Sequence, residues 1–252
     1  MDFTIKIYKE LLQSLIDQNY SFQTFDEFLK LPKDRSIVLR HDVDLLPNNS
    51  LDFAKIQADA GVKGVYYFRA VPESWDEKVI KEIASLGHEI GYHYECLTTC
   101  NGNMIEGIQD FEKNLSALRK LTTVSTICMH GSPMSKYDSK DLWKKYDYRN
   151  YNLIGEPYFD VNFNEVFYLT DTGRKWDGGK ASVRDRVDSS FNLSFHSTQE
   201  IIASLFKKDL PDKIMFTFHP QRWNNNFYLW TKELMLQNAK NIIKRLFYVK
   251  SN

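Results

Sequence analysis

Four things that this 252-residue sequence lacks narrow the class of protein that it encodes. Its cysteines are few and unevenly spaced, without a CxxC pair, so we expect reduced thiols at Cys96, Cys100 and Cys128. Its 33 basic and 33 acidic residues cancel, which gives no electrostatic reason to expect nucleic acid or an anionic membrane as the main partner. No apolar run approaches the ~20 residues that a membrane span needs, and the charged N-terminus lacks the apolar core of a signal peptide. We therefore expect a cytoplasmic protein with no membrane insertion.

The chain also lacks internal repeats, low-complexity tracts and Pro/Gly/Ser-rich linkers, so we expect residues 1–252 to form a single domain. Short apolar runs alternate with amphipathic helical patterns, which is typical of βα units around a parallel sheet or barrel. The first 35 residues are read as an N-terminal helical segment that packs on this unit.

The periodicity of the apolar residues predicts the individual elements. Helices are expected at residues 5–17, 25–31, 50–60, 76–86, 103–121, 198–206 and 232–247. Strands are expected at residues 37–40, 65–68, 89–92, 126–129, 166–169, 193–195 and 214–218. Residues 145–164 are expected to form a long loop with room for one more strand. The basic stretch 232–250 is interpreted as a terminal helix whose apolar residues pack on the domain.

Polar side chains capable of chemistry follow six of the expected strands. They are Asp42 and Asp44, Arg69, His93 and Glu95, His130, Asp171, and His219. Because the carboxyl ends of parallel strands lie at one face of such folds, we expect these side chains to converge there. Apolar strands have no other reason to end repeatedly in His, Asp or Arg, so this face is the predicted active site.

The alternation of side chains along a strand shows which of these residues can share one site. Asp42 and Asp44 stand two residues apart, so an extended backbone points both to one face. His41 then points to the other face and is interpreted as a packed or hydrogen-bonded histidine. His88 and His93 are about 16 Å apart along a strand, too far to share a metal ion. We expect His88, at the entry end of its strand, to be structural.

Two carboxylates with two or three imidazoles form a ligand set that suits Zn²⁺ or a similar first-row divalent ion. Each residue has a plain structural alternative. Asp42 and Asp44 could lie in a solvated turn before Pro47, and His93, His130 or His219 could be a satisfied core histidine. A metal site accounts for the whole set at once.

Three segments carry a family resemblance: the HDVD motif at residues 41–44, the GHEIGYH motif at 87–93 and the FHP motif at 218–220. Together they resemble the polysaccharide deacetylases of the NodB-homology superfamily, and more closely a cytosolic branch associated with surface-polysaccharide synthesis. The resemblance spans roughly residues 35–225. It implies a single-domain α/β fold, a distorted, TIM-like (β/α) barrel. It also implies a metal-dependent hydrolase that removes N- or O-acetyl groups from sugars.

The resemblance also implies roles for individual residues. Asp42 matches the catalytic base, Asp44 the metal-binding aspartate, His93 the first metal histidine and His219 the general acid. Because Val43 separates the two aspartates, which of them plays which role stays open.

Two positions depart from the family pattern. The second metal histidine usually follows the first by four residues, and Leu97 stands there in this chain. His130 stands where the family usually carries an arginine that orients the base. We favour His130 as the third ligand, with Glu95 as the alternative.

Residues near the rim of the predicted active site are candidates for substrate binding: Arg69, Asp171, Trp176, Arg222 and Trp223. Tryptophan faces stack on sugar rings, and arginine forks bind phosphate or carboxylate. The expected substrate is an acetylated sugar, and in a cytoplasmic setting a nucleotide- or lipid-linked form suits the arginines. The sequence leaves the sugar and the oligomeric state open.

Three other functions compete with deacetylation. Another metal hydrolase on the same fold, an amidohydrolase or a phosphoesterase, would use the same ligands. A catalytically silent sugar-binding barrel would explain the leucine at position 97. A retaining glycosidase that uses Asp42 and a distant glutamate explains none of the histidines.

Overall fold

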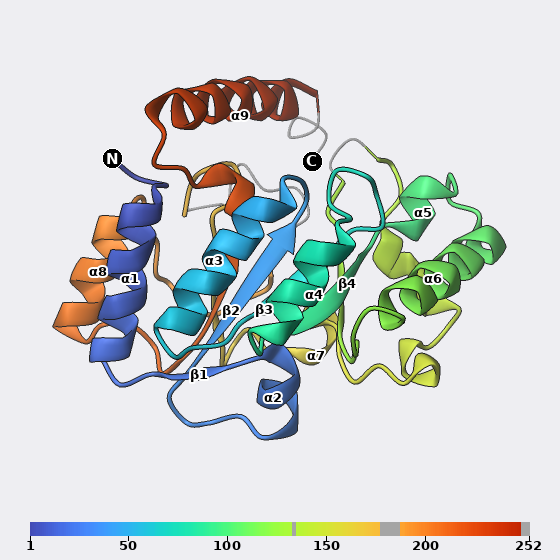
Figure 1. Cartoon of the computed structure of the whole chain (residues 1–252), viewed down its shortest axis with the longest axis horizontal. Helices are drawn as coiled ribbons and strands as arrows, with labels where there is room; N and C mark the ends of the chain where they lie inside the picture. Colours follow the sequence, from blue (N-terminus) through green and yellow to red (C-terminus); the bar gives the residue numbers. More distant parts are fainter. Residues whose placement is uncertain (133–134, 177–186, 248–252) are drawn as a thin grey trace.

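The computed structural model describes residues 1–132, 135–176 and 187–247, which fold around one parallel sheet (Figure 1). Its strands are β1 (Ser21–Gln23), β2 (Ser36–Val43), β3 (Val65–Phe68), β4 (Glu89–Tyr94), β5 (Ile127–Met129), β6 (Phe167–Thr170) and β7 (Lys213–Phe218). The order across the sheet is β5-β4-β3-β2-β7-β6. β1 pairs with the first half of β2, and β3 pairs with the second half. The long strand β2 is therefore the centre of the sheet.

Helices follow most of the strands and cover the outside of the sheet. They are α1 (Ile5–Asp17), α2 (Phe25–Lys30), α3 (Pro47–Asp59), α4 (Glu77–Ser85), α5 (Cys96–Thr99), α6 (Met104–Arg119), α7 (Pro157–Asp160), α8 (Thr198–Lys207) and α9 (Phe227–Phe247). The single-turn segments η1 (Ser139–Lys144), η2 (Tyr148–Tyr151) and η4 (Pro220–Arg222) lie in the connections.

Local signals in the sequence explain where several helices begin and end. Thr24 and Glu27 form a capping box at the start of α2, so each side chain accepts a hydrogen bond from the other's backbone N–H. Asp76 caps α4 by accepting from two backbone N–H groups. Gly61 and Gly87 follow α3 and α4 with φ of 71° and 87°, a conformation that glycine adopts without strain.

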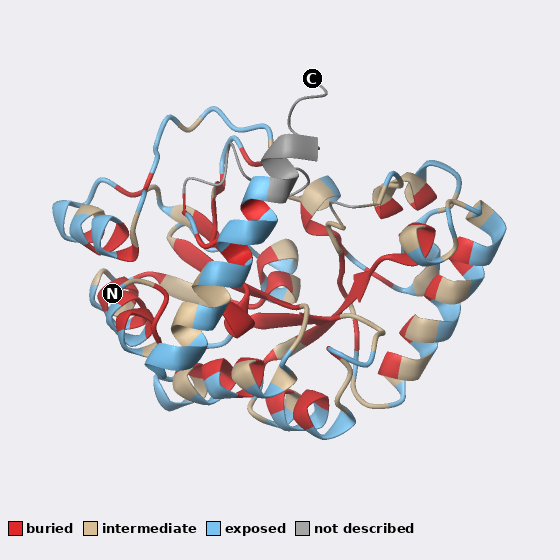
Figure 2. Cartoon of the chain, turned by 90° about the horizontal axis from the view of Figure 1, so that it is seen from above, coloured by how far each residue is buried: buried red, intermediate tan, exposed pale blue. Residues whose placement is uncertain are grey.

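The sheet curls but does not close. Within the described residues no ladder joins β5 to β6, and only an isolated bridge between Thr126 and Gly155 lies on that side. The predicted fold class, an α/β distorted barrel, is confirmed. All eight residues of β2 are buried, as in a parallel sheet that is covered on both faces (Figure 2).

Two histidines lie behind the sheet, as expected. His41 stacks on Tyr66, and its Nδ1 lies 3.0 Å from the Val65 carbonyl oxygen. His88 accepts a hydrogen bond from the Gly64 N–H, and its other ring nitrogen lies 2.9 Å from the carbonyl oxygen of Ala54. Both rings therefore hold β2, β3 and β4 against α3.

Three element predictions differ from the structure. The strand expected at residues 193–195 is wrong: this stretch is an unpaired loop, and Phe195 is buried there by packing on Phe167. The short strand β1 and the helical turn α5 were not predicted, because neither is long enough to show a period. Residues 145–164 contain η2 and α7 in place of a further strand.

The C-terminal helix α9 was expected to pack through its apolar residues. It instead turns Gln237 and Asn241 toward the body of the protein, and Leu236 and Ile242 are 48% and 58% exposed. The last residues of the expected basic stretch, 248–250, lie outside the described part of the chain. Among the described helices, α9 included, none has the length and apolarity that crossing a membrane requires.

Candidate active site

The carboxylate of Asp44 is the point at which the strand ends meet. Asp44 directly follows β2, and its Oδ1 lies 3.7 Å from Nε2 of His93 in β4 and 3.5 Å from Nε2 of His130 after β5. Its Oδ2 lies 3.8 Å from Nε2 of His219, which follows β7. Asp42, in β2, points to the same place, with Oδ2 3.6 Å from Nε2 of His93. The structure thus brings together all five residues that the sequence placed at the metal and in catalysis.

The surroundings of Asp44 Oδ1 suit a divalent ion in two respects. Asp44 Oδ1 is buried and has no hydrogen-bond partner among the described residues, which is costly for a carboxylate oxygen unless something binds it. Ligand atoms held about 2.1 Å from a tetrahedral zinc ion stand roughly 3.4 Å from one another. The separations from Asp44 to His93 and His130 are close to this value. The pKa of Asp44, which burial alone would raise, is lowered by the three histidines around it.

Hydrogen bonds at the far ring nitrogens orient both candidate histidine ligands. His93 Nδ1 lies 2.9 Å from the Cys128 carbonyl oxygen, and His130 Nδ1 lies 2.8 Å from Glu95 Oε2. A proton on each Nδ1 leaves the Nε2 lone pair facing Asp44, as in many metal-binding histidines. Burial lowers the pKa of His93 to about 4, so its ring is neutral and able to bind a metal near pH 7.

Glu95, the alternative third ligand, is occupied on both oxygens. Oε2 accepts from His130, and Oε1 accepts from the guanidinium of Arg69 at 2.7 and 2.8 Å. Arg69 also donates to the backbone carbonyl of Asp44. Glu95 is thus placed to orient His130, and this arrangement favours His130 over Glu95 as the ligand.

A buried arginine holds Asp42. Arg40 donates from Nε and Nη2 to the two carboxylate oxygens of Asp42 at 2.8 and 2.6 Å. Burial alone would raise the pKa of Asp42, but Arg40 and then His93 outweigh it and lower the pKa to about 2. Asp42 is therefore ionised at neutral pH and fixed in orientation by a two-point contact.

Asp171, expected near the substrate, is bonded on both carboxylate oxygens to His219 and its neighbours. The carboxylate is fully buried and accepts hydrogen bonds from His219 Nδ1 at 2.6 Å, from the backbone N–H of His219, from Trp223 Nε1 and from Arg222. Burial and the nearby Arg222 would lower the pKa of His219, but Asp171 outweighs them, and the net shift is upward. His219 therefore keeps a proton on Nε2 at a higher pH than an ordinary histidine.

The other rim candidates lie mostly in the interior. Trp176 and Trp223 are 3% and 1% exposed and pack edge-on against each other, and Trp176 donates to Thr198 Oγ1. Their rings therefore offer no open face to a sugar in this structure. Arg222 is also buried, on Asp171, and Arg69 is engaged by Glu95.

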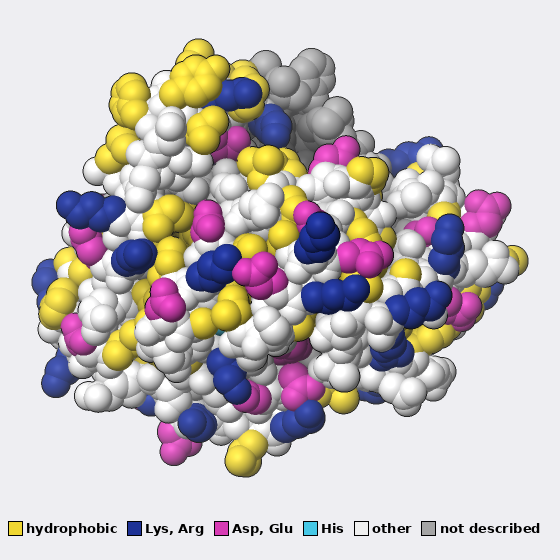
Figure 3. Space-filling model, viewed as in Figure 1, with side chains coloured by type: hydrophobic (Ala, Val, Ile, Leu, Met, Phe, Trp, Pro, Cys, Tyr) yellow, Lys and Arg dark blue, Asp and Glu magenta, His cyan; other side chains and the backbone are white. Residues whose placement is uncertain are grey.

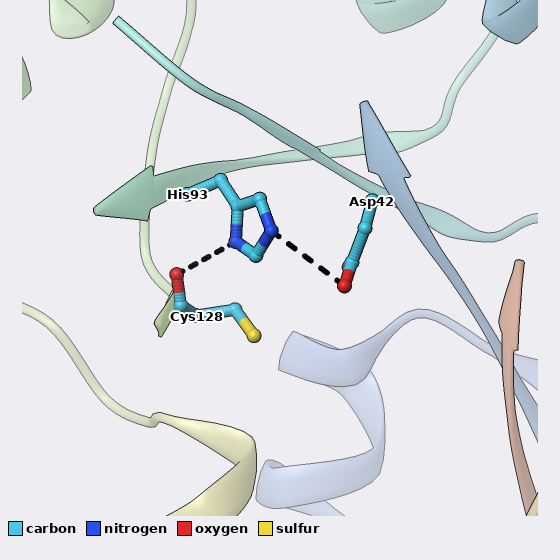
Figure 4. A group of neighbouring side chains, drawn as sticks. All are labelled: Asp42, His93 and Cys128. Atoms are coloured by element: carbon cyan, nitrogen blue, oxygen red, sulfur yellow. Dashed lines mark hydrogen bonds and ion pairs between the residues drawn. The ribbon is translucent and has the colours of Figure 1, made fainter. Parts of the chain in front are cut away.

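A thiol lies beneath the site. Cys128 in β5 offers a sulfur that, with Asp42 and His93, forms a buried group able to hold a metal ion (Figure 4). This group shares His93 with the Asp44 set, and among the described residues it is the one group of three whose ligand atoms all lie within 4.8 Å of one another. Both oxygens of Asp42 accept from Arg40, whereas Asp44 Oδ1 has no such bond, so we favour the Asp44 set.

Sequence reasoning missed Arg40 and the position of Cys128. A signal for Arg40 was present, because residues 40, 42 and 44 alternate and so share one face of β2. Cys128 gave no such signal, since its approach to Asp42 depends on the pairing of β4 with β5.

No family model and no curated protein matches the chain. The solved structures that resemble it include a CE4 family pseudoenzyme from Bacillus anthracis, at 13% identity and a TM-score of 0.45, covering 85% of this chain and 63% of that one. A Streptococcus mutans CE4 esterase has 13% identity and a TM-score of 0.45, with 87% and 84% covered. A family 4 carbohydrate esterase from Streptomyces lividans in complex with acetate has 10% identity and a TM-score of 0.43, with 82% and 89% covered. The chain thus spans less than two thirds of the pseudoenzyme.

Proposed function

We propose that this protein is a metal-dependent hydrolase that removes an acetyl group from an N- or O-acetylated sugar. The observation that carries the proposal is the carboxylate of Asp44, 19% exposed, which faces His93, His130 and His219. The motifs that resemble the polysaccharide deacetylases lie on these same strand ends. A nucleotide- or lipid-linked sugar is the substrate form that we propose. Cys96, Cys100 and Cys128 form no disulfide among the described residues, which suits the reducing cytoplasm, where we place the protein.

Asp44, His93 and His130 would hold the ion, with zinc proposed because the set combines one carboxylate with two imidazoles. A bound divalent ion would polarise a water molecule and the acetyl carbonyl. Asp42, ionised and held by Arg40, then takes a proton from the attacking water. His219 gives the proton on its Nε2 to the departing sugar nitrogen or oxygen, while Asp171 stabilises the charged ring.

The test is acetate release from an N-acetylhexosamine oligosaccharide and from a nucleotide-linked N-acetylhexosamine. We expect Asp42→Asn and His219→Ala each to lower turnover by at least about 10²-fold, since a positioned proton transfer contributes that much. Asp212→Asn, at a carboxylate whose side chain is 67% exposed, is the matched control and should leave turnover unchanged. Near-normal rates in both site variants would contradict the roles of Asp42 as base and His219 as acid.

A measurement of bound metal distinguishes the proposed enzyme from a catalytically silent sugar-binding barrel. Protein purified without chelator should carry about one divalent ion per chain, and His93→Ala and His130→Ala should each lose it. His196→Ala, at an exposed histidine, should keep it. Retention of the metal in His130→Ala with loss in Cys128→Ala would move the site to the Asp42, His93 and Cys128 group. An intact metal with no acetate release would favour another metal hydrolase.

A further inference from the structure

The C-terminal helix α9 lies across the top of the molecule, beyond the end of the sheet toward which β2 points (Figure 1). Several of its described side chains bind the body of the protein by polar contacts. Asn241 donates to the carbonyl oxygen of Gly173 at 3.0 Å and accepts from Gln237. Trp230 donates from its ring to the carbonyl oxygen of Asp2. The two described α9 side chains that are most buried, Gln237 and Asn241, are thus both polar, whereas the apolar side of a surface helix usually faces the core.

The outward face of α9 carries six large apolar side chains together with the exposed Lys232. Its large exposed side chains are Phe227 (70%), Tyr228 (71%), Leu229 (46%), Met235 (68%), Leu236 (48%) and Ile242 (58%). Figure 3 shows hydrophobic side chains gathered over this part of the molecule. We call these six residues the α9 strip. Monomeric proteins rarely expose a contiguous apolar patch of more than a few hundred Å², and larger ones mark contact sites.

We propose that the α9 strip is the contact surface of a symmetric dimer of this chain, in which two α9 helices pack antiparallel. The first support is spacing: Tyr228, Met235 and Ile242 recur every seven residues, and Leu229 and Leu236 repeat the step beside them. A seven-residue repeat keeps one seam of a helix facing a partner helix along its length.

Charge provides the second support. Glu233 and Lys240 lie seven residues apart along one edge of the strip. In an antiparallel pair with its two-fold axis near Leu236, Glu233 of each copy lies beside Lys240 of the other. The same patch thus complements itself twice, as a two-fold interface requires. The chain has no formal net charge, so an anionic membrane gains little electrostatic attraction for this surface.

The dimer is tested with the full chain by sedimentation velocity and light scattering over a range of concentrations. We expect wild-type protein to dimerise, and Met235→Glu to raise the dissociation constant at least about tenfold, because the carboxylate is buried on both sides of the axis. Phe206→Glu, at a side chain of α8 that is 62% exposed, is the matched control and should leave the dimer intact. Circular dichroism should show both variants folded, since both positions are exposed.

Charge reversal tests the antiparallel register. Glu233→Lys and Lys240→Glu should each weaken the dimer, and the double variant should restore it. A wild-type chain that stays monomeric at 100-fold above typical assay concentrations overturns the proposal, as does a dimer that Met235→Glu leaves unchanged. Wild-type binding to phosphatidylglycerol vesicles that Met235→Glu abolishes, without dimers in solution, would assign the strip to a lipid surface.

Discussion

Arg40, Asp42 and Asp44 show at the residue scale what alternation along a strand can and cannot predict. The rule that strands end in functional residues identified Asp42 and Asp44, because both lie at the carboxyl end of β2. Arg40 lies deeper in the same strand, yet its guanidinium reaches Asp42. Which of several inward side chains pair depends on their rotamers, which a sequence pattern does not specify.

We expect the contact between Arg40 and Asp42 to affect the proposed proton transfer by Asp42 and to leave metal binding unchanged. We expect Arg40→Lys to lower turnover by about tenfold or more, because lysine keeps the charge but loses the two-point contact. Metal content should stay near that of the wild type, since Arg40 does not contact Asp44, His93 or His130 in any bond described for it. Turnover and metal content measured on the same preparation check this prediction. Loss of both together would show that Arg40 serves the fold or the metal site.

Asp171 should set the alkaline limit of activity. His219, the proposed general acid, can give up a proton only while it is protonated, so we expect activity to fall as the pH rises through its pKa. Because Asp171 raises that pKa, Asp171→Asn should move the alkaline limb of the kcat profile to lower pH. Trp223→Phe, which removes another hydrogen bond to the same carboxylate, should move the limb much less. If the alkaline limb of the kcat profile stays in place in Asp171→Asn, that limb reports the titration of a group other than His219.

At the scale of elements, periodicity predicted the long helices and the buried strands but not the short pieces. At residues 193–195 two apolar side chains alternate with a serine, as in a strand, but only Phe195 is buried, against Phe167, while Leu193 is 39% exposed. A buried loop residue with an apolar neighbour gives the same short signal as a strand. The helix α9 is the clearest failure. Its apolar residues were taken to face the domain, yet Leu236 and Ile242, two of those with described side chains, are 48% and 58% exposed. A single sequence gives the period of an apolar face, but not the surface that covers it.

Packing between β3 and β4 depends on one glycine. A Cβ added at Gly91 would overlap the ring of Tyr67, whose hydroxyl lies 3.1 Å from Thr126 Oγ1. We expect Gly91→Ala to lower the free energy of unfolding by about 1–3 kcal/mol, as overpacked cores do. In a Tyr67→Leu background the same change should cost less, because the overlapping ring is gone. Denaturant unfolding of the four proteins measures this coupling, and equal costs in both backgrounds would contradict it.

At the scale of the whole molecule, the candidate catalytic residues lie at one rim of the sheet. Two buried, neutral histidines lie on the face of the sheet that is covered by helix α3. Parallel topology explains the position of the candidate site, because strands β2 to β7 all end at the same rim of the sheet. This is why distant motifs could be joined from the sequence. The buried histidines affect stability, because His41 and His88 are packed between the sheet and the helices.

Burial lowers the pKa of His41 to about 3 and also lowers that of His88. Below the ordinary value of 6.5 the unfolded chain therefore binds protons that the folded chain does not. Stability is fully present above pH 6.5 and is lost as the pH falls toward the folded pKa values, at up to about 1.4 kcal/mol per pH unit for each histidine. Urea unfolding between pH 7 and 5 should show this slope, and His41→Leu should reduce it by about one proton even if its absolute stability is lower. His196→Leu, at an exposed histidine, should leave the slope unchanged. A wild-type slope near zero would mean that the rings behind the sheet take up protons without unfolding.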